Sequence, residues 1–137
     1  VIRTLEPDHH SWIGHSVAPY KDWAWSDLGV MIHAPVVLKV NGQWIVAGRS
    51  QESDLVDGQY QKFEGTDRTH HTSVWRIEDD KAEHILTVPS AGDCSYAGLA
   101  HGVDGEVLMS YYSQHEWLPV PTDRPTPSDV FLARFKM

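Results

Sequence analysis

PVVLKVNGQWIVAGR, residues 35–49, is the stretch that decides the fold. Its two flanks, residues 35–40 and 43–49, are rich in Val, Ile and Leu, which favour extended strands. Asn41-Gly42 separates the flanks, and this dipeptide readily takes the positive φ values that a two-residue hairpin turn requires. The stretch therefore predicts a tight antiparallel hairpin.

A second pair of apolar runs follows this hairpin after a polar loop at residues 50–71. The runs, residues 72–78 and 82–88, are joined by the acidic turn sequence at residues 79–81. Residues 35–90 together predict a four-stranded antiparallel meander, the unit from which propeller blades are built.

The pattern begins again in the last third of the chain. Asp104-Gly105 separates residues 96–103 from residues 107–112 and predicts a second hairpin with a tight type I′ turn. The run DVFLARFK, residues 129–136, takes the place of a third strand, and a fourth is missing from this unit.

We therefore expect an all-β fold of antiparallel four-stranded meanders, forming about two β-propeller-like blades in a single domain over residues 1–137. Residues 35–90 would be one blade and residues 91–137 an incomplete one. Residues 1–34 show neither strand alternation nor a helical stripe and predict a loop-rich segment. At ~40–50 residues a blade, a full ring exceeds this length, which indicates a fragment of a longer propeller or part of an oligomeric ring.

Composition excludes several classes of partner. The 137 residues carry a formal net charge of −8 without any run of Lys or Arg, so nucleic acid is not expected as a partner. No apolar stretch approaches the ~20 residues of a membrane span. The nine histidines lack the spacing of metal sites, and we expect neither a metal nor another cofactor. A single cysteine, Cys94, leaves the redox compartment open.

Six Trp and five Tyr are many for a chain of this length. Such rings pack between blades, and on the surface they offer flat faces to sugar rings. A carbohydrate or another small molecule is therefore the expected ligand.

Polar residues gather at the two ends of AGDCSYAGLAHGVDGEVLMSYYSQHE, residues 91–116. Because the strands of a hairpin are antiparallel, Asp93 and Tyr96 at its start should lie at the same sheet edge as His115 and Glu116 at its end. The sequence thus predicts an edge that carries two carboxylates, a phenol and an imidazole.

The chain resembles the carboxy-terminal part of sialidase-superfamily β-propeller proteins. The resemblance lies in WIGHS at residues 12–16, AP-x-x-L-x-x-NG-x-W-I-x-AGR at 34–49, the block at 91–116 and FLARF at 131–135. It covers most of the chain, and the block at 91–116 is its most specific part. It implies a glycoside hydrolase of the exo-sialidase type.

The resemblance also implies roles for individual residues. In sialidases a tyrosine is the nucleophile, and arginine forks hold the substrate carboxylate. Tyr96 would be that nucleophile, and Arg49, at the end of its hairpin, would bind the carboxylate. Two acidic residues beside the phenol and two substrate-contacting residues complete the candidate site: Asp93, Glu116, Tyr112 and His115.

The chain departs from sialidases in three respects. It has no S-x-D-x-G-x-x-W aspartate box, no set of several rim arginines and no early blades to supply an acid/base aspartate. A non-catalytic carbohydrate-binding or assembly module with a propeller-like fold is therefore the alternative function.

The third strand of the incomplete unit also predicts an assembly. Residues 129–136 would leave an unpaired strand edge, which soluble proteins normally cover. Residues 1–4, a short β-prone segment, could pair with it from within the chain or from a neighbouring copy. The preferred donor is a neighbouring copy, so a homo-oligomer is expected.

Overall fold

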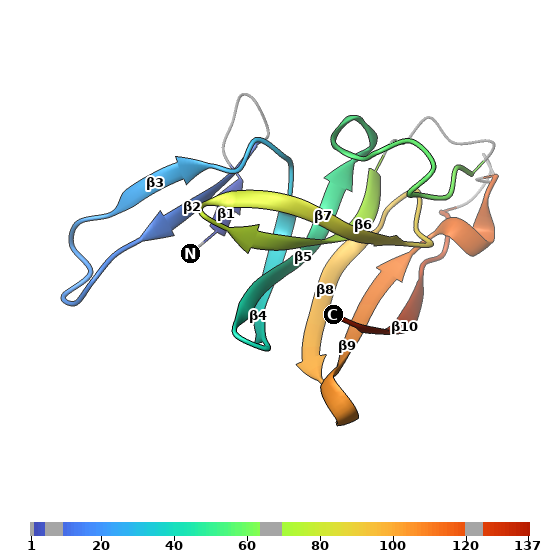
Figure 1. Cartoon of the computed structure of the whole chain (residues 1–137). Coiled ribbons are helices and arrows are strands. Elements are labelled where there is room, and N and C mark those ends of the chain that lie inside the picture. The colour runs from blue at the N-terminus through green and yellow to red at the C-terminus, as the bar shows by residue number, and fades with distance from the viewer. Residues whose placement is uncertain (1, 5–9, 64–69, 120–124) are drawn as a thin grey trace.

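The computed structural model describes residues 2–4, 10–63, 70–119 and 125–137, and within them it is all-β. Three antiparallel sheets follow one another along the molecule (Figure 1). Short 3₁₀ turns at Glu52–Asp54, Val103–Gly105 and His115–Trp117 are the helical elements of these residues. The predicted fold class is confirmed.

The middle sheet is the predicted meander, with the strand order β4-β5-β6-β7. Its strands are β4 (His33–Val40), β5 (Gln43–Gln51), β6 (His70–Glu78) and β7 (Lys81–Val88). Val40 pairs with Gln43 around Asn41 and Gly42, whose φ angles are 49° and 86°. The predicted two-residue hairpin turn is confirmed.

The third sheet has the order β8-β9-β10 and comprises β8 (Ser95–His101), β9 (Glu106–Ser113) and β10 (Asp129–Lys136). Its first hairpin is present, and the predicted tight turn at Asp104-Gly105 is confirmed, because the backbone N–H of Glu106 donates to the Val103 carbonyl around these two residues. Asp104 and Gly105 supply the positive φ angles, 54° and 75°, that a type I′ turn requires. The backbone N–H of Gly102 donates to the Glu106 carbonyl over 2.8 Å, so Val103 is one residue more on the β8 side than a two-residue hairpin needs.

The first sheet was not predicted from the sequence. It comprises β1 (Ile2–Thr4), β2 (Ser11–His15) and β3 (Ala24–Asp27) in the order β1-β2-β3. These strands are too short to show alternation in the sequence. The Trp25 ring packs directly on Gly14, where an added Cβ would lie only 2.8 Å from the ring.

The pairing of β1 also corrects the assembly hypothesis. Ile2 lies opposite Ile13, so the amino-terminal strand completes the first sheet of its own chain and does not pair with β10. Pairing of Ile2–Thr4 with β10 within one chain is therefore wrong, whereas pairing with β10 of a neighbouring copy, the preferred alternative, stays a prediction. The reason is contiguity in sequence, because β2 follows β1 closely and offers a nearer edge.

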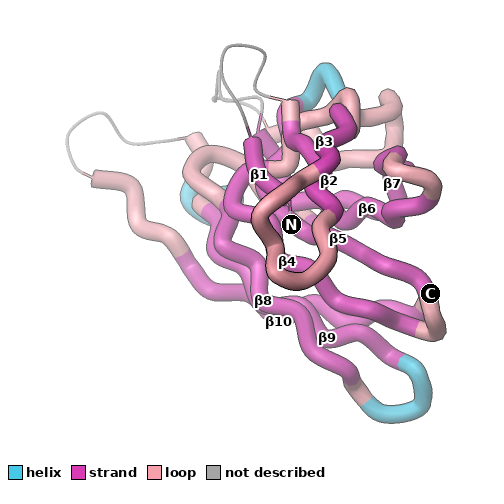
Figure 2. Tube along the Cα trace, turned by 90° about the vertical axis from the view of Figure 1, so that its left-hand side faces the viewer, coloured by secondary structure: helices cyan, strands magenta, loops and turns pink. Residues whose placement is uncertain are grey.

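The middle sheet is covered on both faces. Ile45 and Ala47 of β5 contribute to the core shared with β8 and β9, whereas Val46 between them contributes to the core shared with the first sheet. This is the alternation expected of a strand buried on both faces. The first strands of successive sheets lie beside each other, β1 against β4 and β4 against β8, as the innermost strands of neighbouring blades do (Figure 1, Figure 2).

Candidate functional site

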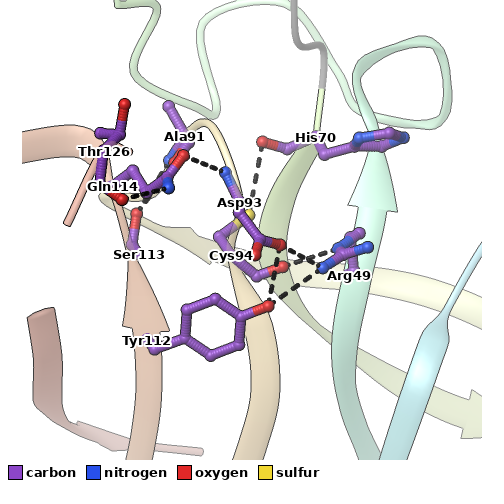
Figure 3. A network of polar contacts seen from close by, with 9 residues as sticks. All are labelled: Arg49, His70, Ala91, Asp93, Cys94, Tyr112, Ser113, Gln114 and Thr126. Carbon is purple, nitrogen blue, oxygen red and sulfur yellow. Dashed lines mark hydrogen bonds and ion pairs between the residues drawn. The ribbon is translucent and has the colours of Figure 1, made fainter. Parts of the chain in front are cut away.

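Arg49, near the carboxyl end of β5, joins the middle sheet to the third sheet. Its Nε donates to the Cys94 carbonyl oxygen over 2.6 Å, and its Nη2 donates to Asp93 Oδ1 over 2.8 Å. Nη2 also lies 3.2 Å from the hydroxyl of Tyr112 (Figure 3). One guanidinium thus contacts a backbone carbonyl, a carboxylate and a phenol, which its fixed fork of donors permits.

Tyr112 of β9 donates its hydroxyl hydrogen to Asp93 Oδ1 over 2.8 Å. Burial of the phenol and its hydrogen bond to the Asp93 carboxylate raise the pKa of Tyr112, against a smaller opposing effect of Arg49. The phenol therefore stays protonated at neutral pH and acts as a hydrogen-bond donor. Asp93 is itself anchored, because its backbone N–H donates to Gln114 Oε1 over 2.9 Å.

Tyr96 lies next to this group and is turned out to solvent. Its side chain is 73% exposed, and its ring stacks on that of Tyr112 with centroids 6.0 Å apart. The register of β8 on β9 shifts between Ser95 and Gly98, and Tyr96 within this irregularity has a φ of 46°. Left-handed φ angles are uncommon for residues other than glycine, and such strain concentrates at functional positions.

Four of the predicted residues therefore lie together: Arg49, Asp93, Tyr96 and Tyr112, here called the Arg49 cluster (Figure 3 shows all but Tyr96). The predicted register explains this grouping, since Ser95 of β8 pairs with Tyr112 of β9. The Asp93 carboxylate accepts a hydrogen bond from the phenol of Tyr112. The resemblance implied an acidic residue beside the phenol of Tyr96 instead.

His115 and Glu116 form a separate pair beyond the end of β9. The imidazole of His115 is buried against the rings of Phe63 and Phe131, with centroids 5.4 Å and 4.5 Å away. Burial lowers the pKa of His115, so it is neutral at pH 7. The Glu116 carboxylate is exposed and lies 3.6 Å from His115 Nε2. In the part of the chain that is described, these side chains make their contacts away from Arg49.

A layer of buried serines holds the strand ends under the cluster. The Ser90 hydroxyl accepts from the Thr72 backbone N–H over 2.7 Å and donates to the Val88 carbonyl over 2.8 Å. The Ser113 hydroxyl accepts from the Ala91 N–H over 3.0 Å. Sequence reasoning missed these residues, since isolated serines at strand ends give no signal by themselves.

Gln114 is a further residue whose role the sequence did not indicate. Besides its bond to the Asp93 backbone, its amide Nε2 donates to the Thr126 carbonyl over 3.1 Å (Figure 3). Gly92, at a φ of 69°, leaves the room that this side chain occupies, because a Cβ there would lie 2.7 Å from Gln114 Oε1. Gln114 thus positions Asp93 for its contacts with Arg49 and Tyr112.

Cys94 lies under the cluster and is chemically protected. Burial raises the pKa of its thiol to about 11, and Sγ lies 3.6 Å from the His70 carbonyl oxygen. A thiol that stays protonated is a poor nucleophile. Cys94 therefore has a packing role.

Comparison with protein-family models, with curated proteins and with solved structures found no match to this chain. Among the described residues no group of three or more His, Cys, Asp or Glu side chains is arranged to hold a metal ion. The same residues contain no helix with the length and apolar character of a membrane span.

Proposed function

We propose that the chain binds carbohydrate at the Arg49 cluster. The observation that carries the proposal is the adjacency of an exposed aromatic face, Tyr96, to a hydrogen-bonded group of a guanidinium, a carboxylate and a phenol. A sugar ring presents an apolar face and a rim of hydroxyls, and it is recognised by an aromatic ring together with a few placed polar groups.

The electrostatics favour a ligand that is neutral or carries one negative charge. Asp93 compensates the charge of Arg49 through their 2.8 Å ion pair, and both side chains remain partly exposed, at 25% for Arg49 and 49% for Asp93. A ligand carboxylate would compete with Asp93 for the guanidinium, whereas a hydroxyl group can bond to either partner. Sialic acids and neutral sugars are therefore the two ligand types to compare.

A sialidase-like glycoside hydrolase is the second candidate, and the bond from Tyr112 to Asp93 is what favours it. In such a reaction the phenol oxygen bonds to the anomeric carbon as the glycosidic bond breaks, the phenol proton passes to the carboxylate, and the leaving group departs with the bonding electron pair and takes a proton from water. Water then cleaves the glycosyl-phenol bond, and the phenol oxygen regains a proton. The raised pKa of Tyr112 and the exposure of Tyr96 count against it, because a nucleophilic phenol is helped by a lowered pKa and by exclusion of water.

Binding is tested by titrating the ¹⁵N-labelled protein with the methyl α-glycoside of N-acetylneuraminic acid and with lactose. We expect saturable shifts at residues of the Arg49 cluster for at least one sugar, and Tyr96→Ala should weaken that binding about tenfold. Tyr20→Ala is the matched control, because Tyr20 is also an exposed tyrosine, at 64%, with a positive φ of 62°. Equal loss in both variants, or shifts elsewhere only, would refute the proposal.

Hydrolysis is tested separately with the 4-methylumbelliferyl glycosides of N-acetylneuraminic acid and galactose. The binding-module proposal expects no release of the fluorophore. Release that Tyr112→Phe or Tyr96→Phe abolishes, and that Tyr20→Phe leaves unchanged, would instead establish the hydrolase and identify which phenol is the nucleophile.

A further inference from the structure

A cavity of about 450 Å³ opens between the first and middle sheets, next to the turn that joins β6 to β7. The core between these sheets is filled by Leu28, Ile32, Val46 and Trp75, and it stops short of the turns. Beyond it, apolar side chains from both sheets line the open space: Ile2, Ile13, Val37, Trp44 and Ile77. Its volume is within the range of pockets that hold small molecules.

The polar side chains that line this cavity are acidic apart from one histidine. Asp79 and Asp80 form the two-residue β6–β7 turn, with φ angles of 48° and 58°. Both residues line the cavity. Asp80 is held in place, because Oδ1 lies 2.6 Å from His15 Nε2 and Oδ2 accepts from the Ser26 hydroxyl over 2.9 Å. Asp79, beside it, is exposed at the mouth.

Trp44 supplies an aromatic face at the same mouth. Half of its side chain, 50%, is exposed, which is unusual for a residue that could be buried between sheets. The ammonium of Lys39, its cross-strand neighbour, lies 5.3 Å from the centroid of the indole, so this ring already attracts a cation. An indole that lines the same cavity as two carboxylates favours a positively charged group, which would share the ring with the Lys39 ammonium.

We propose that this cavity binds a small organic cation with a flat apolar body, of the arylalkylamine class. The body packs against Ile13, Val37 and Ile77, and the ammonium lies between the Asp79 carboxylate and the Trp44 ring. A carbohydrate fits this lining poorly, because its many hydroxyls would meet apolar side chains without hydrogen-bond partners. The site is separate from the Arg49 cluster and does not depend on the proposed carbohydrate binding.

The test compares three probes of similar size and different charge: phenethylamine, 2-phenylethanol and 3-phenylpropionate. Binding is followed by the fluorescence of the protein and by amide shifts of the ¹⁵N-labelled chain. We expect shifts at Ile13, Trp44 and Ile77, with phenethylamine binding about tenfold more tightly than 3-phenylpropionate and 2-phenylethanol in between. Equal affinity for the cation and the anion, shifts confined to other regions, or no saturable binding at millimolar concentrations would overturn the proposal.

A pair of variants isolates the contribution of charge. Asp79→Asn removes the carboxylate and keeps a residue that tolerates a left-handed φ, so the turn should persist. It should weaken phenethylamine binding about fivefold and leave 2-phenylethanol binding unchanged. Asp104→Asn is the matched control, because Asp104 is an exposed turn aspartate with a φ of 54° in the other hairpin. An equal effect of both variants would show a nonspecific response to net charge and would also overturn the proposal.

Discussion

Arg49 of β5 and Asp93, which lies in the connection between β7 and β8 and is 44 positions further along the chain, form an ion pair of 2.8 Å. The same guanidinium donates to the carbonyl oxygen of Cys94, so the contact couples the end of β5 to the backbone segment that leads into β8. The pair therefore fixes how the two sheets meet at this end of the molecule.

Replacing Arg49 should cost more stability than replacing its acidic partner. Arg49→Met leaves the Cys94 carbonyl without its donor and should lower the free energy of unfolding by about 1–3 kcal/mol. Asp93→Asn, at a half-exposed position, should lower it by less than about 1 kcal/mol. Urea denaturation measures both values. Arg134→Met is the control, since Arg134 is 68% exposed and 3.8 Å from Glu106, and a cost equal to that of Arg49→Met would contradict the expectation.

The turn glycines should resist substitution for reasons of backbone conformation alone. Gly42 and Gly105 have φ angles of 86° and 75°, and an added Cβ would meet no atom within 4 Å at either residue. Gly42→Val and Gly105→Val should each destabilise the protein by about 1–3 kcal/mol, because a β-branched residue resists a positive φ.

Asparagine at the same two positions distinguishes strain from contact. It tolerates the left-handed region, so Gly42→Asn and Gly105→Asn should cost clearly less than the valine variants in thermal denaturation. Unchanged melting temperatures in both valine variants would disprove the hairpin turns.

Cys94 should react with alkylating reagents only when the protein unfolds. Its thiol is buried, and its pKa is raised from 9.0 to about 11, so the native protein at pH 8 offers almost no accessible thiolate. Iodoacetamide labelling measured by mass spectrometry should increase in parallel with unfolding in urea. Rapid stoichiometric labelling of the native chain would rule out the buried position.

The same shift predicts how stability depends on pH in the alkaline range. Between the unfolded value of 9.0 and the folded value of about 11, the unfolded thiol loses its proton while the folded thiol keeps it. Deprotonation thus stabilises the unfolded state, and the free energy of unfolding should fall as the pH rises above about 9. Cys94→Ala should reduce this slope, and an identical slope in both proteins would contradict the assignment.

The homo-oligomer expected from the sequence remains a prediction, with an additional structural basis. In the described residues β10 pairs with β9 alone, and its Val130 and Leu132 side chains are 77% and 84% exposed. Exposed apolar residues on an edge strand favour pairing with another strand. Light scattering should give at least twice the chain mass of 15.5 kDa, and Leu132→Lys should shift the protein toward the monomer. A monomer at high micromolar concentration would refute it.

The sequence predicted the parts of the fold that depend on local conformation. Asn41-Gly42 specified its turn because both residues tolerate the φ angles that the turn needs. Asp104-Gly105 specified its turn in the same way, but the extra residue before it, Val103, could not be predicted, because it follows from the hydrogen bond of Gly102 with Glu106. The first sheet was missed because its strands are short and lack alternation.

The candidate site was predictable to the extent that it follows from strand register. Asp93 and Tyr112 lie at one edge because β8 and β9 are antiparallel, and this could be expected from the hairpin alone. The burial of His115 could not, because the rings that cover it come from distant segments, Phe63 and Phe131. The cavity beside Trp44 depends on the packing of two sheets and has no local signal.

The position of the middle sheet between two cores has a consequence for cooperativity. Val46 and Trp75 contribute to one core, and Ile45 and Val74, their neighbours along β5 and β6, contribute to the other. Loss of either outer sheet would expose one entire face of the middle sheet to water. The three sheets should therefore unfold in one transition, and an isolated sheet of this chain should not be a folding unit.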